Sequence, residues 1–218
     1  MNGRRVSRGQ GLVEFAIILP ILLLLLLGVV EMGYLLRNYL VVVNADREAC
    51  RFAARGRFSD EAVIARAVNA GGVIRINGQD VPILRPDPLS TDPNTAIIVT
   101  HIPIDSNGHV DAVSVTTAVS GVISTGPYSV TLVQPSDSTI SLTIVTQHQG
   151  DATQSINATR EAAGYEKMDN NIVVVEIIFM HYPMFGKMLS RLSAGIVSDP
   201  PWIIHTHTEM RVVTDRGG

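Results

Sequence analysis

Two histidines near the carboxyl end of the chain have a spacing that could serve metal chemistry. His205 and His207 are two positions apart in an expected strand, so their side chains would share one face. With a third ligand from His181 or Glu209 they could bind zinc, because a catalytic zinc site uses three protein ligands and keeps one position open. Paired histidines on a strand face are more often packing or surface groups. We therefore predict no metal site.

The sequence carries no other recognised signature of catalysis. It has no Gly-rich phosphate loop, no H-E-x-x-H pair and no G-x-S-x-G nucleophile elbow. The single cysteine, Cys50, excludes an internal disulfide and a cysteine-based metal cluster. The net charge of −3 argues against a nucleic-acid partner, which a basic surface would bind. We expect a protein without catalytic residues or a cofactor.

A carboxylate at the start of a long apolar run is the more informative feature. Glu14 precedes Phe15–Val30, a stretch without a charged residue, and apolar residues extend it to Leu12–Leu36 with Glu31 as the second interruption. A membrane-spanning helix needs about 20 mostly apolar residues at about 1.5 Å each. Pro20 should kink the helix, which a membrane helix tolerates. The sequence predicts a single membrane-spanning helix.

Three kinds of segment fit this apolar run. A secretory signal peptide needs a small-residue cleavage site after the run, and residues 31–34 (Glu-Met-Gly-Tyr) offer none. An uncleaved signal anchor fits the hydropathy and leaves Glu14 without a role. A segment cleaved on the cytoplasmic side of the run accounts for Glu14, and the residues before the run favour this interpretation.

The charges around the run permit a cytoplasmic amino terminus. The segment before the run contains three arginines and no acidic residue. Basic residues also follow the run, offset by Asp46 and Glu48, and a long carboxyl-terminal domain can cross the membrane despite its charges. The positive-inside rule allows this orientation and does not by itself require it. The three arginines are Arg4, Arg5 and Arg8.

The residues at the start of the run carry a family resemblance. Gly9 ends a short basic leader, four residues follow, and then come Glu14, Phe15 and the aliphatic run. The run ends in a Gly-x-x-Glu-x-Gly segment at residues 28–33. In this pattern the chain resembles the TadE-like minor pseudopilins of the tight-adherence (Flp-type) pilus system, over roughly residues 4–57.

The resemblance implies maturation by a prepilin peptidase. The cut would fall between Gly9 and Gln10 on the cytoplasmic side, so the apolar helix would stay in the mature protein with Glu14 near its new start. The resemblance also implies the partners. They are the prepilin peptidase itself, sister pseudopilins, an inner-membrane pilus assembly platform and membrane lipid.

Glu14 then has a physical role in assembly. A carboxylate at mid-bilayer costs roughly 2.5–3.5 kcal/mol, and less near the interface. The amino group that cleavage would expose on a neighbouring subunit is a compact cation that could neutralise Glu14. Such a pair, next to Phe15, would fix the axial register between helices. The alternative is a glutamate that simply lies at headgroup depth.

The helix is expected to continue beyond the membrane to about Gly56. At about 100° per residue, polar residues between Arg37 and Arg55 fall within one stripe, and the opposite face is apolar apart from Asp46. We expect Asp46 to be buried or at the rim and satisfied by local donors. Cys50 is expected to be a small core residue, with an intermolecular disulfide left open.

Short helices and a hairpin are expected around the strands of the remaining chain. Ser59 is a good cap for a helix that ends at Gly71-Gly72. Asn77-Gly78 indicates a hairpin turn. Asp151–Asp169 is expected to be a loop or helix, and Pro183–Leu192 a short helix. Asn157 begins a sequence that also matches a glycosylation signal, a motif that is common by chance.

The rest of the chain predicts strands, because it is rich in Val, Ile, Thr and Ser between turn residues. The segment Val173–Met180 is expected to be a buried strand or, on an edge, a surface for strand addition. The expected strands are Val73–Ile76, Val81–Leu84, Ala96–Ile104, Val110–Ala118, Tyr128–Gln134, Thr139–Gln147, Ile172–Tyr182 and Trp202–Thr214.

We predict an α+β fold, in which a long N-terminal transmembrane and amphipathic helix precedes a mostly antiparallel β-rich extracytoplasmic domain. The expected parts are a cleaved basic leader (1–9), a transmembrane helix (10–36), an amphipathic extension (37–57) and the domain (58–218). The leading function is that of a structural, non-enzymatic minor pseudopilin-like protein of the bacterial cytoplasmic membrane, needed for pilus assembly. The alternatives are an uncleaved signal-anchored adaptor or binding protein and, third, a tethered hydrolase or metal-dependent enzyme built around the carboxyl-terminal histidines.

Overall fold

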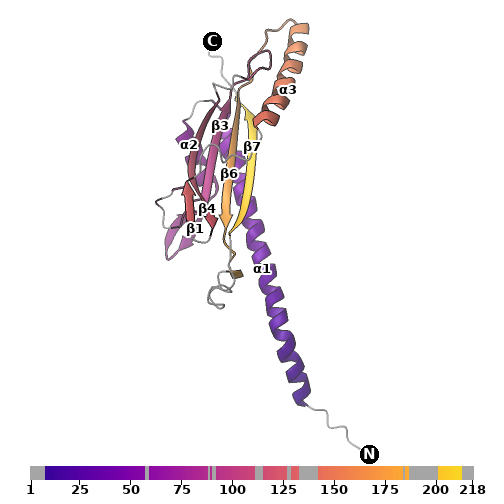
Figure 1. Ribbon diagram of the computed structural model, residues 1–218, viewed down its shortest axis with the longest axis vertical. Coiled ribbons are helices and arrows are strands. Elements are labelled where there is room, and N and C mark those ends of the chain that lie inside the picture. Colours follow the sequence, from indigo (N-terminus) through magenta and orange to yellow (C-terminus); the bar gives the residue numbers. More distant parts are fainter. Residues whose placement is uncertain are drawn as a thin grey trace, which may run out of the picture.

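A long helix extends away from a domain built on β-sheets, and the domain lies at one end of the molecule (Figure 1). The computed structural model describes residues 8–56, 59–87, 89, 92–110, 115–126, 129–132, 142–183, 185–186 and 201–212. Within them, one long N-terminal helix is followed by antiparallel β-sheets and shorter helices. The predicted α+β fold is confirmed.

Helix α1 runs without interruption through 46 residues, Arg8–Ala53, and is therefore about 69 Å long. It continues through Pro20 and across residue 36, where the sequence predicts the end of the membrane span. The large apolar side chains between Leu12 and Val30 are exposed apart from the half-buried Leu27, because the domain covers only the other half of the helix. Such a half-covered helix needs a second apolar environment.

Five antiparallel strands form the main sheet in the order β5-β4-β3-β6-β7. Strand β6 is buried at every position and pairs along its length with both β3 and β7. The segment Val173–Met180 is therefore a central buried strand, one of the two predicted alternatives. The strands are β3 (Thr95–Ile102), β4 (Thr116–Gly126), β5 (Ser129–Leu132), β6 (Ile172–His181) and β7 (Trp202–Arg211).

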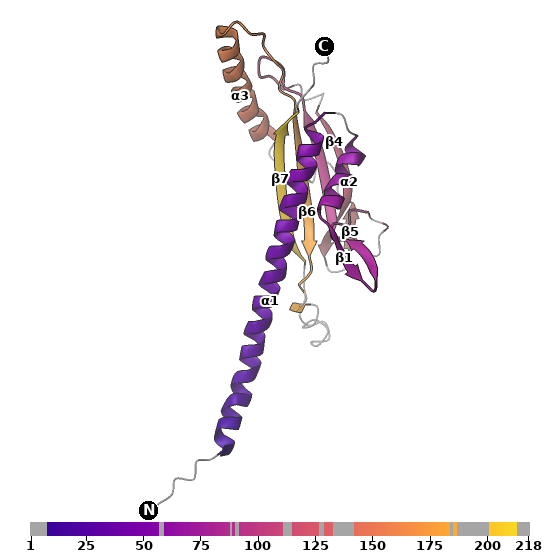
Figure 2. The same cartoon turned by 180° about the vertical axis from the view of Figure 1, so that it is seen from behind.

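The main core lies between one face of this sheet and two helices. Helix α1 and helix α2 (Asp60–Ala70) lie side by side on that face (Figure 2). The helix residues that touch the sheet are mostly small, which lets α1 approach the strands closely. Buried core residues include Val42, Ala45, Ala49, Ala53, Val63 and Ala67 from the helices and Val173, Val175, Ile177 and Phe179 from β6.

The turn chemistry around α2 follows the sequence. Ser59 caps α2, its side chain accepting a hydrogen bond from the backbone N–H of Ala62 at 3.4 Å. Asn77 and Gly78 join β1 (Val73–Ile76) to β2 (Gln79–Pro82) with φ of 51° and 81°, the left-handed values that a tight hairpin requires. The second strand ends at Pro82, earlier than predicted, and the next two residues turn into the core.

The strand predicted at Thr139–Gln147 is wrong over its described part. Residues from Leu142 belong to helix α3 (Leu142–Ala162), which extends beyond the end of the sheet (Figure 1). Its β-branched start predicts a strand, but such residues cost a helix only about half a kcal/mol each, so tertiary contacts decide. Asn157 supplies those contacts, because its amide donates to Ser106 O and Met168 O. The helix option predicted for residues 151–169 is confirmed as far as residue 162.

Two further segments differ from prediction or lie outside the described residues. The strand predicted at Val110–Ala118 begins later, since β4 starts at Thr116 and Val110 forms only an isolated bridge with Ile104. Of the helix predicted at Pro183–Leu192, residues 185–186 are helical and most of the rest lies outside the described residues, as does the leader before Arg8.

Candidate functional site

The predicted processing site lies in the first turn of α1. The backbone of Gly9 and Gln10 is already helical, and α1 continues from there into the exposed apolar half. Glu14 is exposed on this helix, and the adjacent Phe15 has 60% of its surface exposed. Both residues thus lie on the exposed half of α1, the half that extends away from the sheet (Figure 1).

Glu31 marks the point where α1 meets the domain. It is only 8% exposed, although its neighbours on the helix are exposed. One carboxylate oxygen, Oε1, lies 3.0 Å from Nε2 of His181 at the end of β6, and the other, Oε2, accepts a hydrogen bond from the backbone N–H of Phe185 at 3.2 Å. Both oxygens of this buried carboxylate are therefore satisfied by the domain.

His181 connects two turns of α1. Its Nδ1 accepts a hydrogen bond from the side-chain amide of Asn38 at 2.8 Å, and this fixes Nε2 as the nitrogen that donates to Glu31. The imidazole is 4% exposed in its side chain and packs beside Trp202, with ring centroids 6.0 Å apart. The Glu31–His181–Asn38 cluster clamps the end of β6 to α1.

Asp46 is a second buried carboxylate, on the half of α1 that covers the sheet. It is 1% exposed and accepts a hydrogen bond from Thr208 Oγ1 at 2.9 Å. Among the described residues, its Oδ1 and the hydroxyl of Thr206 have no hydrogen-bond partner. Burial raises the pKa of Asp46 to about 7. The predicted burial is confirmed, and its satisfaction by local donors is only partial.

Cys50 lies one turn further along the same face of α1. Its surface is fully buried and its Sγ donates to Val173 O and Thr208 O. Burial raises the pKa of its thiol to about 12. The prediction of a small core residue is confirmed, and in this fold the thiol is covered by the sheet.

Helix α1 combines these features with a membrane-spanning character. Among the described residues, Gly11–Ala53 is the one helix long and apolar enough to cross a membrane. Residues 9–51 match the family model of the TadE-like proteins. The match confirms the resemblance over this segment, which begins at the predicted cleavage position and contains Glu14, Glu31 and Asp46. No curated protein and no solved structure gave a match.

The TadE-like segment, residues 9–51, covers about a fifth of the chain. TadE-like proteins are structural components of the tight-adherence pilus system. Together with the apolar helix, the match implies a membrane-anchored protein related to that pilus. The hydrogen-bond partners of Glu31 and Asp46 belong to the sheet-based domain, outside this segment. The domain therefore satisfies the two buried carboxylates of the TadE-like segment, at least in part.

The carboxyl-terminal histidines do not assemble as a zinc site would require. His205 and His207 share a face of β7, with ring centroids 6.2 Å apart, as predicted. His181 lies on the opposite face of the sheet with Glu31, so it is not placed to be the third ligand that such a site would need. His205 instead pairs with the buried Glu176. Within the described residues, no group of three or more His, Cys, Asp or Glu is placed to hold a metal ion.

Asn157 is equally unsuited to the modification that its sequence suggests. It is 2% exposed, and its carboxamide both donates to backbone carbonyls and accepts from Met168 N. A glycan needs an exposed amide. The structure therefore assigns this residue to the docking of α3.

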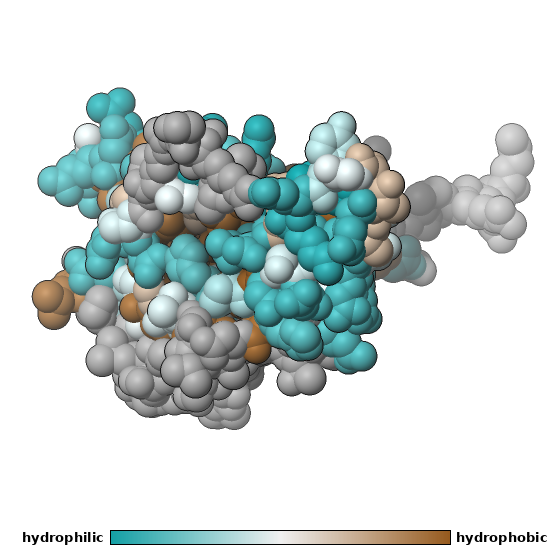
Figure 3. All heavy atoms as spheres, turned by 90° about the horizontal axis from the view of Figure 1, so that it is seen from above, coloured by the Kyte–Doolittle hydropathy of each residue, from teal (hydrophilic) through white to brown (hydrophobic). Residues whose placement is uncertain are grey.

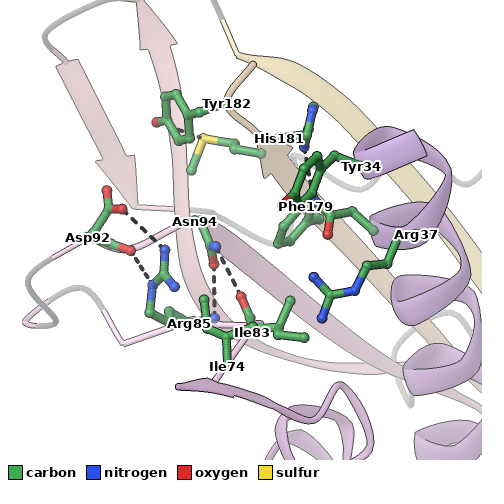
Figure 4. Close-up of a pocket in the computed structure, with 12 residues that line it drawn as sticks. Tyr34, Arg37, Ile74, Ile83, Arg85, Asp92, Asn94, Phe179, His181 and Tyr182 are labelled. Carbon is green, nitrogen blue, oxygen red and sulfur yellow. Dashed lines mark hydrogen bonds and ion pairs between the residues drawn. The ribbon is translucent and has the colours of Figure 1, made fainter. Parts of the chain in front are cut away.

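A pocket of about 240 Å³ lies beside His181, where the TadE-like segment meets the domain (Figure 4). Arg37 reaches it from α1, and Arg85 reaches it from the segment after β2. The Arg85 guanidinium is held by Asp92, and Asn94 binds the backbone of the same segment. Arg37 also lines this pocket, and it has no ion-pair partner among the described residues.

Sequence reasoning singled out Glu14 and missed the cluster around Glu31. The signal was present, because Glu31 is the second charge in the apolar run and a buried carboxylate requires donors. Its partner could not be chosen from the sequence, since His181 is 150 residues away.

Proposed function

We propose that this protein is a minor pseudopilin of a tight-adherence pilus. It is matured by a prepilin peptidase between Gly9 and Gln10, and it spans the bacterial cytoplasmic membrane once with its amino terminus in the cytoplasm. Its role is structural and non-enzymatic. The TadE-like match beginning at Gly9 carries this proposal, and the shape of α1 supports it.

The exposed half of α1 supports a role in assembly. Apolar side chains between Leu12 and Val30 are exposed on nearly all of the helix surface, so this half needs lipid or the helices of other subunits as its surroundings. A peptidase that removes only the leader leaves this surface intact. The mature protein could then exchange lipid contacts for contacts with sister pseudopilins.

The start of α1 suits cleavage. Glycine weakens a helix by roughly 0.5–1 kcal/mol relative to alanine, so Gly9 makes the first turn easy to open for a peptidase. Removal of residues 1–9 takes away three of the 17 basic residues and none of the 20 acidic ones. The net charge would fall from −3 to −6.

Glu14 would then act on a neighbouring subunit. Glu14 is exposed on α1, so the amino group of another mature chain can approach its carboxylate from the surface of the helix. Inside a bundle of apolar helices the pair would be stronger than in water, because the local dielectric constant is low. The pair would set the axial register of adjacent helices, with Phe15 packed beside it.

The experiment that tests the proposal is the amino-terminal sequence and intact mass of the protein isolated from its own membrane. Gly9→Leu is the informative variant, and Gly11→Ala is its matched control, because a Cβ at Gly11 meets nothing within 4 Å. A start at Met1 in the unmodified protein would favour the alternative function, an uncleaved signal-anchored adaptor.

A further inference from the structure

Apolar side chains surround the place where α1 leaves the domain. We define the exit collar as Met32, Leu36, Tyr39, Trp202 and Ile203, which are between 43% and 60% exposed. They line a groove of about 470 Å³ between α1 and the edge strand β7. Two of the five are aromatic residues with a polar tip.

The Glu31–His181–Asn38 cluster fixes the position of the exit collar along the axis of α1. His181 bonds to Glu31 and Asn38, so the end of β6 lies level with residues 31–38 of the helix. Trp202 is the register partner of His181 in the sheet and packs against it. The base of the domain is therefore fixed beside this stretch of α1.

The same stretch is where the helix must leave the membrane. A hydrocarbon core of about 30 Å takes about 20 residues of helix. Counted from Phe15, just after the charged Glu14, it ends near Tyr34. Trp202 and Tyr39 thus reach the headgroup region, where tryptophan and tyrosine are enriched in membrane proteins.

The charges and the opposite end of the domain fit the same arrangement. Arg37 lies at headgroup height and has no ion-pair partner among the described residues, so it can meet a lipid phosphate. The end of the domain that is remote from the span shows mainly hydrophilic side chains among the coloured residues (Figure 3). The apolar collar is found at the end that the membrane would touch.

We propose that the exit collar seats the base of the domain on the membrane surface. Trp202 and Ile203 lie at the boundary of headgroups and hydrocarbon, and Arg37 binds the phosphate of an anionic lipid. Lipid is the occupant because the collar continues the surface of α1 that spans the membrane. The inference needs only the membrane span and goes beyond the proposed function, so it stands whether or not a peptidase cuts the chain.

The single tryptophan of the chain, Trp202, reports on this contact directly. The full chain is reconstituted into vesicles of phosphatidylcholine and anionic phosphatidylglycerol, with or without phosphatidylcholine that is brominated near the top of the acyl chains. We expect Trp202 to lose most of its emission in the brominated vesicles and to be protected from the aqueous quencher acrylamide. Quenching by acrylamide and not by brominated lipid would overturn the proposal.

A second copy of the chain is the competing occupant of the collar. In that case Trp202 would be protected from both quenchers, and dilution with lipid would remove the protection; this result also overturns the proposal. Ile203→Asp should weaken the quenching by brominated lipid. Ile76→Asp is the matched control, because Ile76 is an exposed isoleucine on strand β1 and is 46% exposed against 56% for Ile203. Arg37→Gln should reduce the quenching only when phosphatidylglycerol is present.

Discussion

Glu31 and His181 are 150 residues apart in the sequence and 3.0 Å apart, between Oε1 and Nε2, in the structure. The pair joins the TadE-like segment to the end of the central strand β6. Asn38 binds the other imidazole nitrogen, so His181 is held between two turns of α1. This contact divides α1 into a covered half and an exposed half.

The first prediction concerns this pair. In Glu31→Gln, one of the two carboxylate oxygens becomes an NH₂ group that faces a donor. We expect the free energy of unfolding to fall by about 1–3 kcal/mol, because a buried donor is left without an acceptor. Thermal unfolding of the full chain in detergent micelles, followed by circular dichroism, measures the change.

The matched control for Glu31→Gln is Glu161→Gln. Glu161 pairs with Lys167 on the surface, and both side chains are more than 40% exposed. An exposed ion pair contributes about 0–1 kcal/mol, so this variant should unfold almost as the unmodified protein does. Equal stability of the two variants would show that the Glu31 cluster does not hold α1 on the sheet.

The second prediction concerns the pH dependence of stability. The pKa of Asp46 is about 7 in the fold and 3.8 in its ordinary state, so the folded protein binds the proton more tightly. The contribution of protonated Asp46 to the free energy of unfolding is present in full below about pH 4, and it is lost as the pH rises to about 7. Protonation helps because burial disfavours the charged carboxylate, and the hydrogen bonds from the threonines of β7 lower the pKa only in part.

Asp46→Asn should remove this dependence and stabilise the protein at about pH 8, by up to about 4 kcal/mol. Unfolding of the full chain at about pH 5 and about pH 8 provides the measurement. Asp80→Asn is the control, because Asp80 lies on the exposed hairpin with 67% of its side chain exposed. If Asp46→Asn and the unmodified protein have the same slope with pH, the carboxylate is already ionised without cost in the fold.

The third prediction concerns assembly. Glu14→Ala should insert into the membrane and fold, because Glu14 is exposed on the half of α1 that the domain does not cover. It should no longer co-isolate with sister pseudopilins, since the neighbouring amino terminus loses its counter-charge. Crosslinking in intact membranes followed by affinity isolation measures this loss, with Glu161→Ala as the control. Normal recovery of the partners with Glu14→Ala would remove the register role from Glu14.

The sequence predicts elements well where one physical signal dominates. The apolar run and the one-sided polar stripe predict α1, and the mostly apolar segment 172–181, interrupted by Glu176, predicts β6. The hairpin at Asn77 and Gly78 follows from the need for positive φ. In each of these cases the deciding interactions are local or depend only on burial.

Other features depend on contacts between distant parts of the chain. The start of α3 is β-branched and predicts a strand, but the hydrogen bonds of Asn157 to Ser106 and Met168 favour the helix. His181 was considered with His205, yet the two lie on opposite faces of the sheet because β6 and β7 pair in a register that the sequence does not reveal. The clamp on Glu31 was missed for the same reason.

The most direct test of the central claim is the amino-terminal residue and intact mass of the protein from its own membrane fraction. We predict a mature chain that starts at Gln10, and a chain that keeps Met1 in Gly9→Leu while Gly11→Ala is processed normally. Membrane insertion should be the same in all three proteins. An unmodified protein that starts at Met1, or a Gly9→Leu variant cut at the same bond and rate, would contradict maturation by a prepilin peptidase.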